Sequence, residues 1–265
     1  MKISVLTTVF NRPEHLRLLV ATLAAQSRRP DELIVADDGS AAAAVDAMRA
    51  CLDNCGFATK LVRQDKGGGQ RSAARNLAIR ASSGDYLIFL DCDIVLLPGA
   101  LDVHVQSAAP RRLLCGNRAL LDEATTQALF QASPAPSAED WEQAWLLADR
   151  RAMEDAARLF QRHAALRRWH LARPHKPKLL GCHFSLFRED VERVNGFDEN
   201  FVGWGYEDDD FGRRLYKAGV TPQSVILTAR ALHLWHPTDA PQVLRRRCIR
   251  GMPQDRKSTR LNSSH

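Results

Sequence analysis

The sequence predicts an α/β domain with a mostly parallel central sheet that helices cover on both faces. Short apolar segments of strand character alternate with helix-like segments through the first hundred residues, and the connections between them are short. Polar clusters follow three of the predicted strands, at 7–12, 37–40 and 91–93. Because ligands bind at the carboxyl ends of the strands in such sheets, these clusters predict one functional edge.

The first half of the chain carries this alternation most clearly. A helix opened by Pro13 has an apolar face with helical spacing: Leu16, Leu19, Val20 and Leu23. We predict strands at 3–7, 32–36, 60–63 and 86–90. Two further helices are predicted at 41–53 and 72–81.

The middle segment, residues 111–177, has a different character and is predicted to be a helical insert. Its main part indicates one long charged helix over 138–172, with three large apolar anchors: Trp141, Trp145 and Trp169. Core packing of helices and a lid that faces an acceptor are the two interpretations of this segment.

The last part resumes with a strand at 178–187, a helix at 189–194 and a strand at 225–232. We therefore predict one domain over 1–240, followed by a basic tail over 241–265. The final ten residues, RKSTRLNSSH, look like cloning-adapter sequence and are left out of the fold prediction.

The composition is that of an ordinary soluble protein, with 26% charged residues and a mean hydropathy of −0.30. The longest apolar run, 86–101, contains Asp91 and Asp93, which argues against a membrane span. The N-terminus enters a strand pattern without a signal-peptide pattern, so we expect a cytoplasmic protein. The six cysteines form no CxxC pair, which favours free thiols.

The net charge of +6 is concentrated in the tail. Such a tail is either a solvated end or a contact with anionic lipid at the inner face of a membrane. Nucleic-acid binding is the weakest interpretation, because the basic residues are terminal, and we expect no nucleic-acid partner.

Asp91 and Asp93 follow an apolar strand, where unpaired charge is costly. Strand alternation would place both carboxylates on one side of the chain, and one or both can hold a hard divalent cation against a diphosphate. His233 can complete that metal site and is favoured over His236. The alternative for lone histidines is a structural role.

Two further segments carry donor-binding candidates. In the DDGS turn, Asp38 either caps the local backbone or accepts from a uracil N–H or a ribose hydroxyl. The glycines at 67–69 lack the ending of a P-loop and predict a flexible turn before a helix. That turn would let four side chains approach the nucleotide: Gln70, Arg71, Arg75 and Asn76.

Residues 203–211, GWGYEDDDF, place four consecutive acids beside aromatics and glycines. Like charges at this spacing raise one another's pKa and invite proton transfer, so Glu207 and Asp208 are the candidates for acceptor anchor and base. Trp204 offers a flat face for a sugar ring, and Tyr206 is the second aromatic candidate for acceptor binding. A solvated, acidic helix start is the alternative.

These motifs, in this order, resemble the inverting glycosyltransferases of family 2, which have the GT-A fold, with a C-terminal segment similar to galactosyltransferases and chondroitin synthases. The resemblance rests on TxFNR at 8–12, DDGS, Ala74-Arg75-Asn76, DxD, Asn195-Gly196-Phe197-Asp198 and GWGYEDDDF. It covers roughly 1–110 and 178–240 and leaves the middle segment unmatched. His183 departs from the pattern, since relatives often carry asparagine or a small residue there.

The resemblance implies specific roles. Thr8, Phe10 and Asp38 would hold a uridine, with Arg12 in the same donor-binding motif. Asp93, with Asp91, would engage Mn²⁺ or Mg²⁺ and the diphosphate, and His233 would be a further ligand. Asp208 would be the general base, with Glu207 and Trp204 positioning the acceptor.

The predicted function is therefore transfer of a sugar from a nucleotide-sugar, with UDP as the expected nucleotide, to a glycan, glycolipid or other hydroxyl acceptor. A nucleotidyltransferase is the first alternative, because it also combines an α/β sheet with acidic metal ligands. A catalytically silent module that binds nucleotide-sugars is the second.

Overall fold

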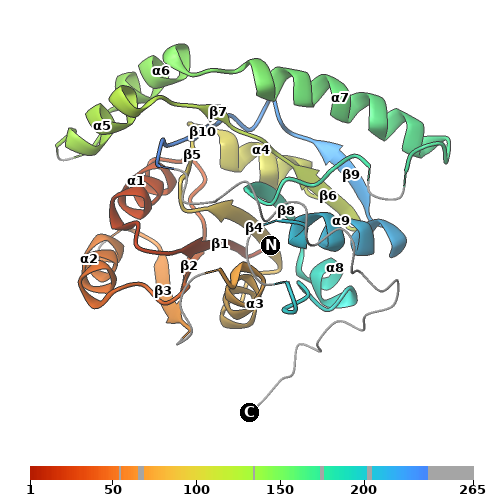
Figure 1. Cartoon of the computed structure of the whole chain (residues 1–265), viewed down its shortest axis with the longest axis horizontal. Coiled ribbons are helices and arrows are strands. Elements are labelled where there is room, and N and C mark those ends of the chain that lie inside the picture. Colours follow the sequence, from red (N-terminus) through yellow and green to blue (C-terminus); the bar gives the residue numbers. More distant parts are fainter. Residues whose placement is uncertain (54, 65–68, 134, 174–175, 202–204, 238–265) are drawn as a thin grey trace.

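The computed structural model describes residues 1–53, 55–64, 69–133, 135–173, 176–201 and 205–237, and its elements form layers around a central sheet (Figure 1). The strands are β1 (Ile3–Val9), β2 (Glu32–Asp37), β3 (Ala58–Arg63), β4 (Tyr86–Asp91), β5 (Ile94–Leu96), β6 (Arg112–Cys115), β7 (Ala119–Leu120), β8 (His183–Phe187), β9 (Thr221–Ser224) and β10 (Ala231–His233). The helices are α1 (Pro13–Ala24), α2 (Ala42–Leu52), α3 (Arg71–Ala81), α4 (Ala100–Ser107), α5 (Glu123–Gln131), α6 (Ala138–Leu147), α7 (Arg151–Arg168), α8 (Arg188–Arg193) and α9 (Glu207–Lys217).

Within the described residues the main sheet has seven strands in the order β3-β2-β1-β4-β8-β6-β9. The first four are mutually parallel, β8 runs antiparallel between β4 and β6, and β9 is parallel to β6. The predicted mostly parallel sheet is therefore confirmed. The predicted strands and helices of the first hundred residues all form, with ends that shift by one or two residues.

The two faces of the sheet carry separate hydrophobic cores because side chains alternate along each strand. On β1, Ile3 and Val5 pack with α1, α2 and α4, whereas Leu6 packs with α3, α8 and α9. The predicted apolar face of α1 is buried on the first of these sides, with each of its four residues at most 6% exposed.

A smaller sheet has the order β5-β10-β7 in the part of the chain that the structure describes. β10 is antiparallel to β5 and parallel to β7. The expected strand at 225–232 is shorter than predicted, because Ala229 N–H closes a turn on the Val225 carbonyl at 2.8 Å before β10 begins. This turn returns the chain to the functional edge.

The segment 111–177 is not purely helical, since β6 and β7 lie near its start. Helices α5, α6 and α7 then form an arc along one side of the molecule (Figure 1). The single helix predicted over 138–172 is wrong: α6 ends before Asp149, whose backbone pairs with that of Leu120 at 2.9 and 3.0 Å. Trp141 is buried, but Trp169 is 74% exposed and anchors no core.

No described helix is long and apolar enough to cross a bilayer. The five cysteines within the described ranges are free thiols, as predicted. The basic tail at 241–265 lies outside these ranges, so its contact with lipid stays a prediction.

Candidate active site

Three neighbouring parallel strands end at one edge of the main sheet. Thr8 on β1 lies opposite Ala36 on β2 and opposite Asp91 on β4. The polar clusters that follow these strands therefore lie side by side, as predicted. Phe10, which is 44% exposed, and half-buried Arg12 extend this edge beyond β1.

Asp38 ties the end of β2 to its two neighbours. Its backbone N–H donates to the Val9 carbonyl at 2.9 Å, and its carboxylate accepts from the Gln64 amide and from the Gln70 N–H, the latter at 3.1 Å. The carboxylate thus holds the first residues of α3, and it is only 5% exposed. Gln70 meets the edge through its backbone in this arrangement.

Arg75 lies at the centre of the site. It is 4% exposed, and its guanidinium donates to Asp208 at 2.6 Å and to Asp91 at 3.2 Å, with Glu207 at 3.6 Å. Burial alone lowers the pKa of Arg75, but the three carboxylates raise it, so it stays charged. The guanidinium is thus bonded to carboxylates of the protein, and its contact with the nucleotide stays a prediction.

Asp208 is the second residue of α9 and is held from two sides. Its Oδ1 accepts from Arg75, and its Oδ2 accepts from the Gly181 N–H at 3.1 Å. A Cβ at position 181 would overlap all three carboxyl atoms of Asp208, so any larger residue there would displace this carboxylate. The sequence prediction missed Gly181, whose position just before a buried strand was the only available signal.

Glu207 is more deeply buried than Asp208, at 3% exposure, and accepts from the Gly205 N–H at 3.0 Å. Burial raises the pKa of Glu207, and the charge of Asp208 raises it further, against the lowering effect of Arg75. Glu207 thereby supports the turn that carries Tyr206, whose φ of 70° is in the left-handed region. Trp204 lies outside the described residues.

Asn76 does not face the functional edge, which corrects its assignment to the donor. It is 1% exposed, and its amide donates to the Phe197 carbonyl at 2.8 Å and accepts from the Phe197 N–H at 2.9 Å. Asn76 therefore clamps the NGFD segment against α3. Arg71 is half-buried at the start of the same helix; burial raises the pKa values of Asp91 and Glu207, and the charge of Arg71 partly offsets that rise.

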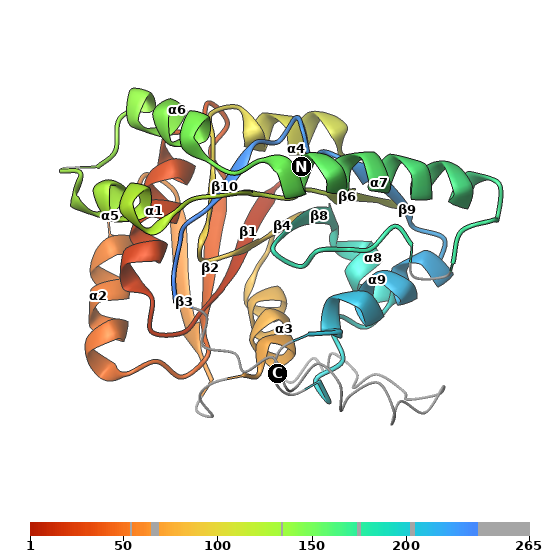
Figure 2. The same cartoon turned by 45° about the horizontal axis from the view of Figure 1, so that its top comes forward.

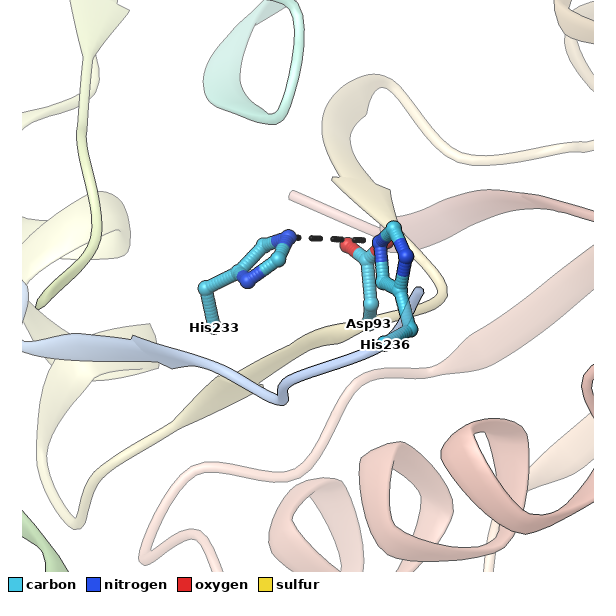
Figure 3. Close-up of side chains that lie close together, drawn as sticks. All are labelled: Asp93, His233 and His236. Atoms are coloured by element: carbon cyan, nitrogen blue, oxygen red, sulfur yellow. Dashed lines mark hydrogen bonds and ion pairs between the residues drawn. The ribbon is translucent and has the colours of Figure 1, made fainter. Parts of the chain in front are cut away.

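Asp93, His233 and His236 form a compact cluster (Figure 3), and the ligand atoms that they offer all lie within 4.8 Å of one another. Asp93 Oδ2 is 3.1 Å from His236 Nε2 and 3.7 Å from His233 Nε2. The pairing of β5 with β10 brings them together, since the Leu234 N–H donates to the Asp93 carbonyl at 2.9 Å.

This cluster differs from the predicted ligand set at two residues. Asp91 faces Arg75 instead, because β4 ends at Asp91 and the next two residues form a turn, so strand alternation stops there. His236, which was the less favoured histidine, joins the cluster, and the His-x-x-His spacing was the signal for it. Burial alone raises the pKa of Asp93, but the His236 hydrogen bond and the nearby positive charges hold it at about 2.

His183, the residue that departs from the family pattern, is fully buried. Its Nε2 is 2.7 Å from His104 Nε2, and its Nδ1 is 3.1 Å from the Asn117 carbonyl. Burial lowers the pKa of His183 to about 4, and burial and His183 lower that of His104. The buried pair therefore lies within the protein and does not face a substrate.

The mostly parallel central sheet flanked by helices is the GT-A fold, and the protein is a glycosyltransferase. The family model "Glycosyl transferase family 2" matches residues 4–168, and "N-terminal domain of galactosyltransferase" matches residues 161–237. The chain belongs to glycosyl transferase family 2. The first match includes residues 111–168, which are most of the middle segment that the motifs did not cover.

Curated relatives include validoxylamine A glucosyltransferase of Streptomyces hygroscopicus subsp. limoneus, 31% identical over 82% of this chain and 48% of that protein. Chondroitin synthase of Escherichia coli is 29% identical over 84% of this chain and 33% of that protein. The chain thus spans about half or less of these relatives. Among solved structures, S. aureus TarS 1-349 superposes with a TM-score of 0.60 at 15% identity, over 88% of this chain and 60% of that one.

A second structural neighbour is the mannosyltransferase PcManGT from Pyrobaculum calidifontis, solved in complex with GDP-Man and Mn²⁺. Its TM-score is 0.58 at 17% identity, over 88% of this chain and 56% of that one. At these identities the two structures establish the shared fold.

Proposed function

We propose that the protein is a metal-dependent, inverting glycosyltransferase that moves a sugar from a UDP-sugar to a hydroxyl of a glycan or glycolipid. The observation that carries the proposal is the position of Asp208. Arg75 and Gly181 hold this carboxylate beside Asp91, at the edge where the donor-binding strands end. A fixed carboxylate at that edge is what deprotonation of an acceptor hydroxyl requires.

On the donor side, Phe10 supplies an exposed aromatic face beyond β1, and Thr8 and Asp38 supply polar groups. Arg12 and Arg71 add positive charge for the diphosphate. TarS 1-349 has been solved in complex with UDP-GlcNAc and with UDP, and PcManGT in complex with GDP-Man, so the fold accommodates nucleotide-sugars in these neighbours. UDP is the nucleotide we propose for this chain.

The cluster of Asp93, His233 and His236 fits a divalent cation, since it offers one carboxylate oxygen and two imidazole nitrogens within binding range of one another. Mg²⁺ prefers a shell of oxygens, whereas imidazole nitrogens bind first-row transition-metal ions, so this donor set favours Mn²⁺ over Mg²⁺. When bound, the cation would neutralise the charge that develops on the departing diphosphate. Asp91, held by Arg75, contributes negative charge next to that site.

Asp208 acts as the base in the proposed step. Its carboxylate takes the proton of the acceptor hydroxyl while the hydroxyl oxygen forms a bond to the anomeric carbon. The bond between that carbon and the diphosphate breaks, and the electron pair leaves with UDP. One base and a single displacement invert the anomeric carbon, as in inverting glycosidases.

Glu207 helps to hold Asp208 in place. Its carboxylate accepts from the Gly205 N–H and forms an ion pair with Arg75, which also pairs with Asp208. Tyr206, carried by that turn, and Trp204, which lies outside the described residues, are the aromatic side chains we assign to the acceptor. Aromatic faces suit the apolar sides of sugar rings, so they orient the ring while Asp208 receives the proton.

The test is a panel of nucleotide-sugars, each with and without Mn²⁺, scored by melting temperature and by release of the free nucleotide. We expect a UDP-sugar to raise the melting temperature only with Mn²⁺, since a ligand that binds the native state stabilises it. Asp208→Asn should retain this shift but lose UDP release, whereas Asp93→Ala should lose the shift.

Three outcomes would count against the proposal. Full activity in excess EDTA would contradict the metal requirement. Release of pyrophosphate from a nucleoside triphosphate would favour a nucleotidyltransferase. Donor binding by the folded protein with no turnover of any nucleotide-sugar would indicate a silent binding module.

A further inference from the structure

Helix α7 carries two hollows on the side that faces the main body of the domain. One, of about 200 Å³, is lined by residues of α7 between 156 and 163 and by Lys176, Lys178 and Leu180. The other, of about 500 Å³, follows along the same helix and is lined by Arg167, Arg168 and His170, together with Tyr216 from α9 and residues 219–222. Figure 2 shows the segment that leads to β8 passing between α7 and α9.

The smaller hollow adjoins the proposed base. Leu180, one of its lining residues, directly precedes Gly181, whose N–H donates to Asp208 at 3.1 Å. Gly116, just beyond the end of β6, also lines this hollow. Both β4 and β6 are antiparallel to β8, so they run in the same direction and end at the same edge of the sheet. The hollow therefore opens at the same edge of the sheet as Asp91 and lies on the α7 side of Asp208.

The charged side chains that line the two hollows are all basic. The stretch 156–188 contains eight lysine and arginine residues and no aspartate or glutamate. Among the described residues that line the two hollows, none is acidic, and six are basic or histidine: His163, Arg167, Arg168, His170, Lys176 and Lys178. Lys178 is compensated by Asp209 at 3.3 Å.

Arg167 is partly committed to structure. Its guanidinium lies 4.2 Å from the Tyr216 ring centroid and donates to the Lys176 carbonyl at 2.6 Å. This hydrogen bond joins Arg167, which lines the larger hollow, to Lys176, which lines the smaller one. Arg168, by contrast, is exposed, and its charge is presented at the wall of the larger hollow.

We infer that these two hollows form a binding track for an anionic, carboxylate-bearing glycan, which extends from Asp208 along α7. The assignment of this glycan as the acceptor rests on the proposed function. Recessed, partly apolar walls with cationic rims suit sugar rings that carry carboxylates, since the rings pack on the walls while the rims pair with the charge. A flat lipid surface would not reach the recessed lining next to Leu180.

The probe is a fluorescent hexamer of galacturonate, compared with its methyl ester, which has the same backbone without charge. We expect the full-length protein to bind the carboxylated hexamer more tightly than the ester, measured by fluorescence anisotropy at low salt. Binding should weaken as the salt rises from about 20 to about 200 mM, because exposed charge pairs are screened.

Two double variants localise the binding. Arg168→Glu/Lys176→Glu reverses one charge in each hollow, and we expect affinity to fall on the order of tenfold or more. Arg151→Glu/Arg162→Glu makes the same change in net charge with both residues on α7, but neither residue lines a hollow, so it should bind like wild type. Both variants keep the basic tail, so the difference between them excludes binding through it. Their melting temperatures report folding.

The inference is overturned if the ester binds as well as the acid, or if both double variants weaken binding equally. It is also overturned if Arg168→Glu/Lys176→Glu loses binding to phosphatidylglycerol vesicles while the hexamer shows no charge preference, since the surface would then be a lipid contact. UDP release by the wild type with water as acceptor reports the proposed function separately, so either idea can fail alone.

Discussion

Replacing Gly181 by alanine perturbs the proposed base without touching its chemistry. The added Cβ overlaps Oδ1, Oδ2 and Cγ of Asp208, whereas ordinary contact needs 3.4–4 Å. The carboxylate must therefore retreat by about 1 Å, and a misplacement of that size can cost about a hundredfold in rate, or about 3 kcal/mol of activation free energy. The retreat also strains the 2.6 Å bond to Arg75 and the 3.1 Å bond to the Gly181 N–H.

The assay is UDP release from the UDP-sugar that the donor panel identifies, with water as acceptor. We expect Gly181→Ala to lose about a hundredfold, approaching Asp208→Asn, while the Mn²⁺-dependent thermal shift with UDP persists. The matched control is Gly212→Ala on α9, the helix that carries Asp208, where the new Cβ meets Leu179 Cβ at 3.1 Å and no carboxylate. Wild-type turnover by folded Gly181→Ala would refute the reasoning.

Three further predictions concern the metal, the buried histidines and the central arginine. His236→Ala removes one nitrogen from the proposed metal site, so the Mn²⁺-dependent thermal shift with UDP should weaken, and an unchanged Mn²⁺ titration would contradict the assignment. His183 has a pKa of about 4 in the fold, against 6.5 in the unfolded chain, so its contribution is fully present above pH 6.5 and is lost as the pH falls toward 4, by about 3 kcal/mol. Urea unfolding between pH 7 and 4.5 should show a smaller loss for His183→Gln than for wild type, and equal slopes would exclude this source. Arg75→Gln leaves three carboxylates without their shared cation and should destabilise the protein by about 3–5 kcal/mol at pH 7. The deficit should shrink toward pH 5 as Asp91 and Glu207, whose pKa values burial already raises, take up protons; a deficit that is constant with pH would argue against a shared ion pair.

Local patterns were enough to predict the sheet and the edge that carries the site. Apolar runs bounded by polar turns located β1, β2 and β4, and their parallel pairing placed Thr8 beside Asp91. These features depend on residues close in sequence and on the general behaviour of α/β sheets, so they were predictable from the chain alone.

The partners of the charged residues were less predictable, because contacts across the fold decide them. Arg75 meets Asp208 133 positions away, and nothing near Arg75 in the sequence distinguishes a buried guanidinium from one that meets phosphate. Asp93 contacts His236 only because β5 pairs with β10. The break between α6 and α7 has the same origin, since the backbone of Asp149 pairs with Leu120.

The order of strands within the described sheets has a consequence for how the chain folds during synthesis. β8 lies between β4 and β6, and β10 lies between β5 and β7, so the last third of the sequence supplies an interior strand to each sheet. A nascent chain that has emerged only to residue 180 holds β4 and β6 with the strand between them still missing. Pairing between strands far apart in the sequence is slow to form, and strand edges that stay unpaired until then are prone to aggregation. Full closure of both sheets, and with it the arrival of Asp208 at Arg75, must therefore await the final stretch of the domain, so truncated products should not accumulate as active enzyme.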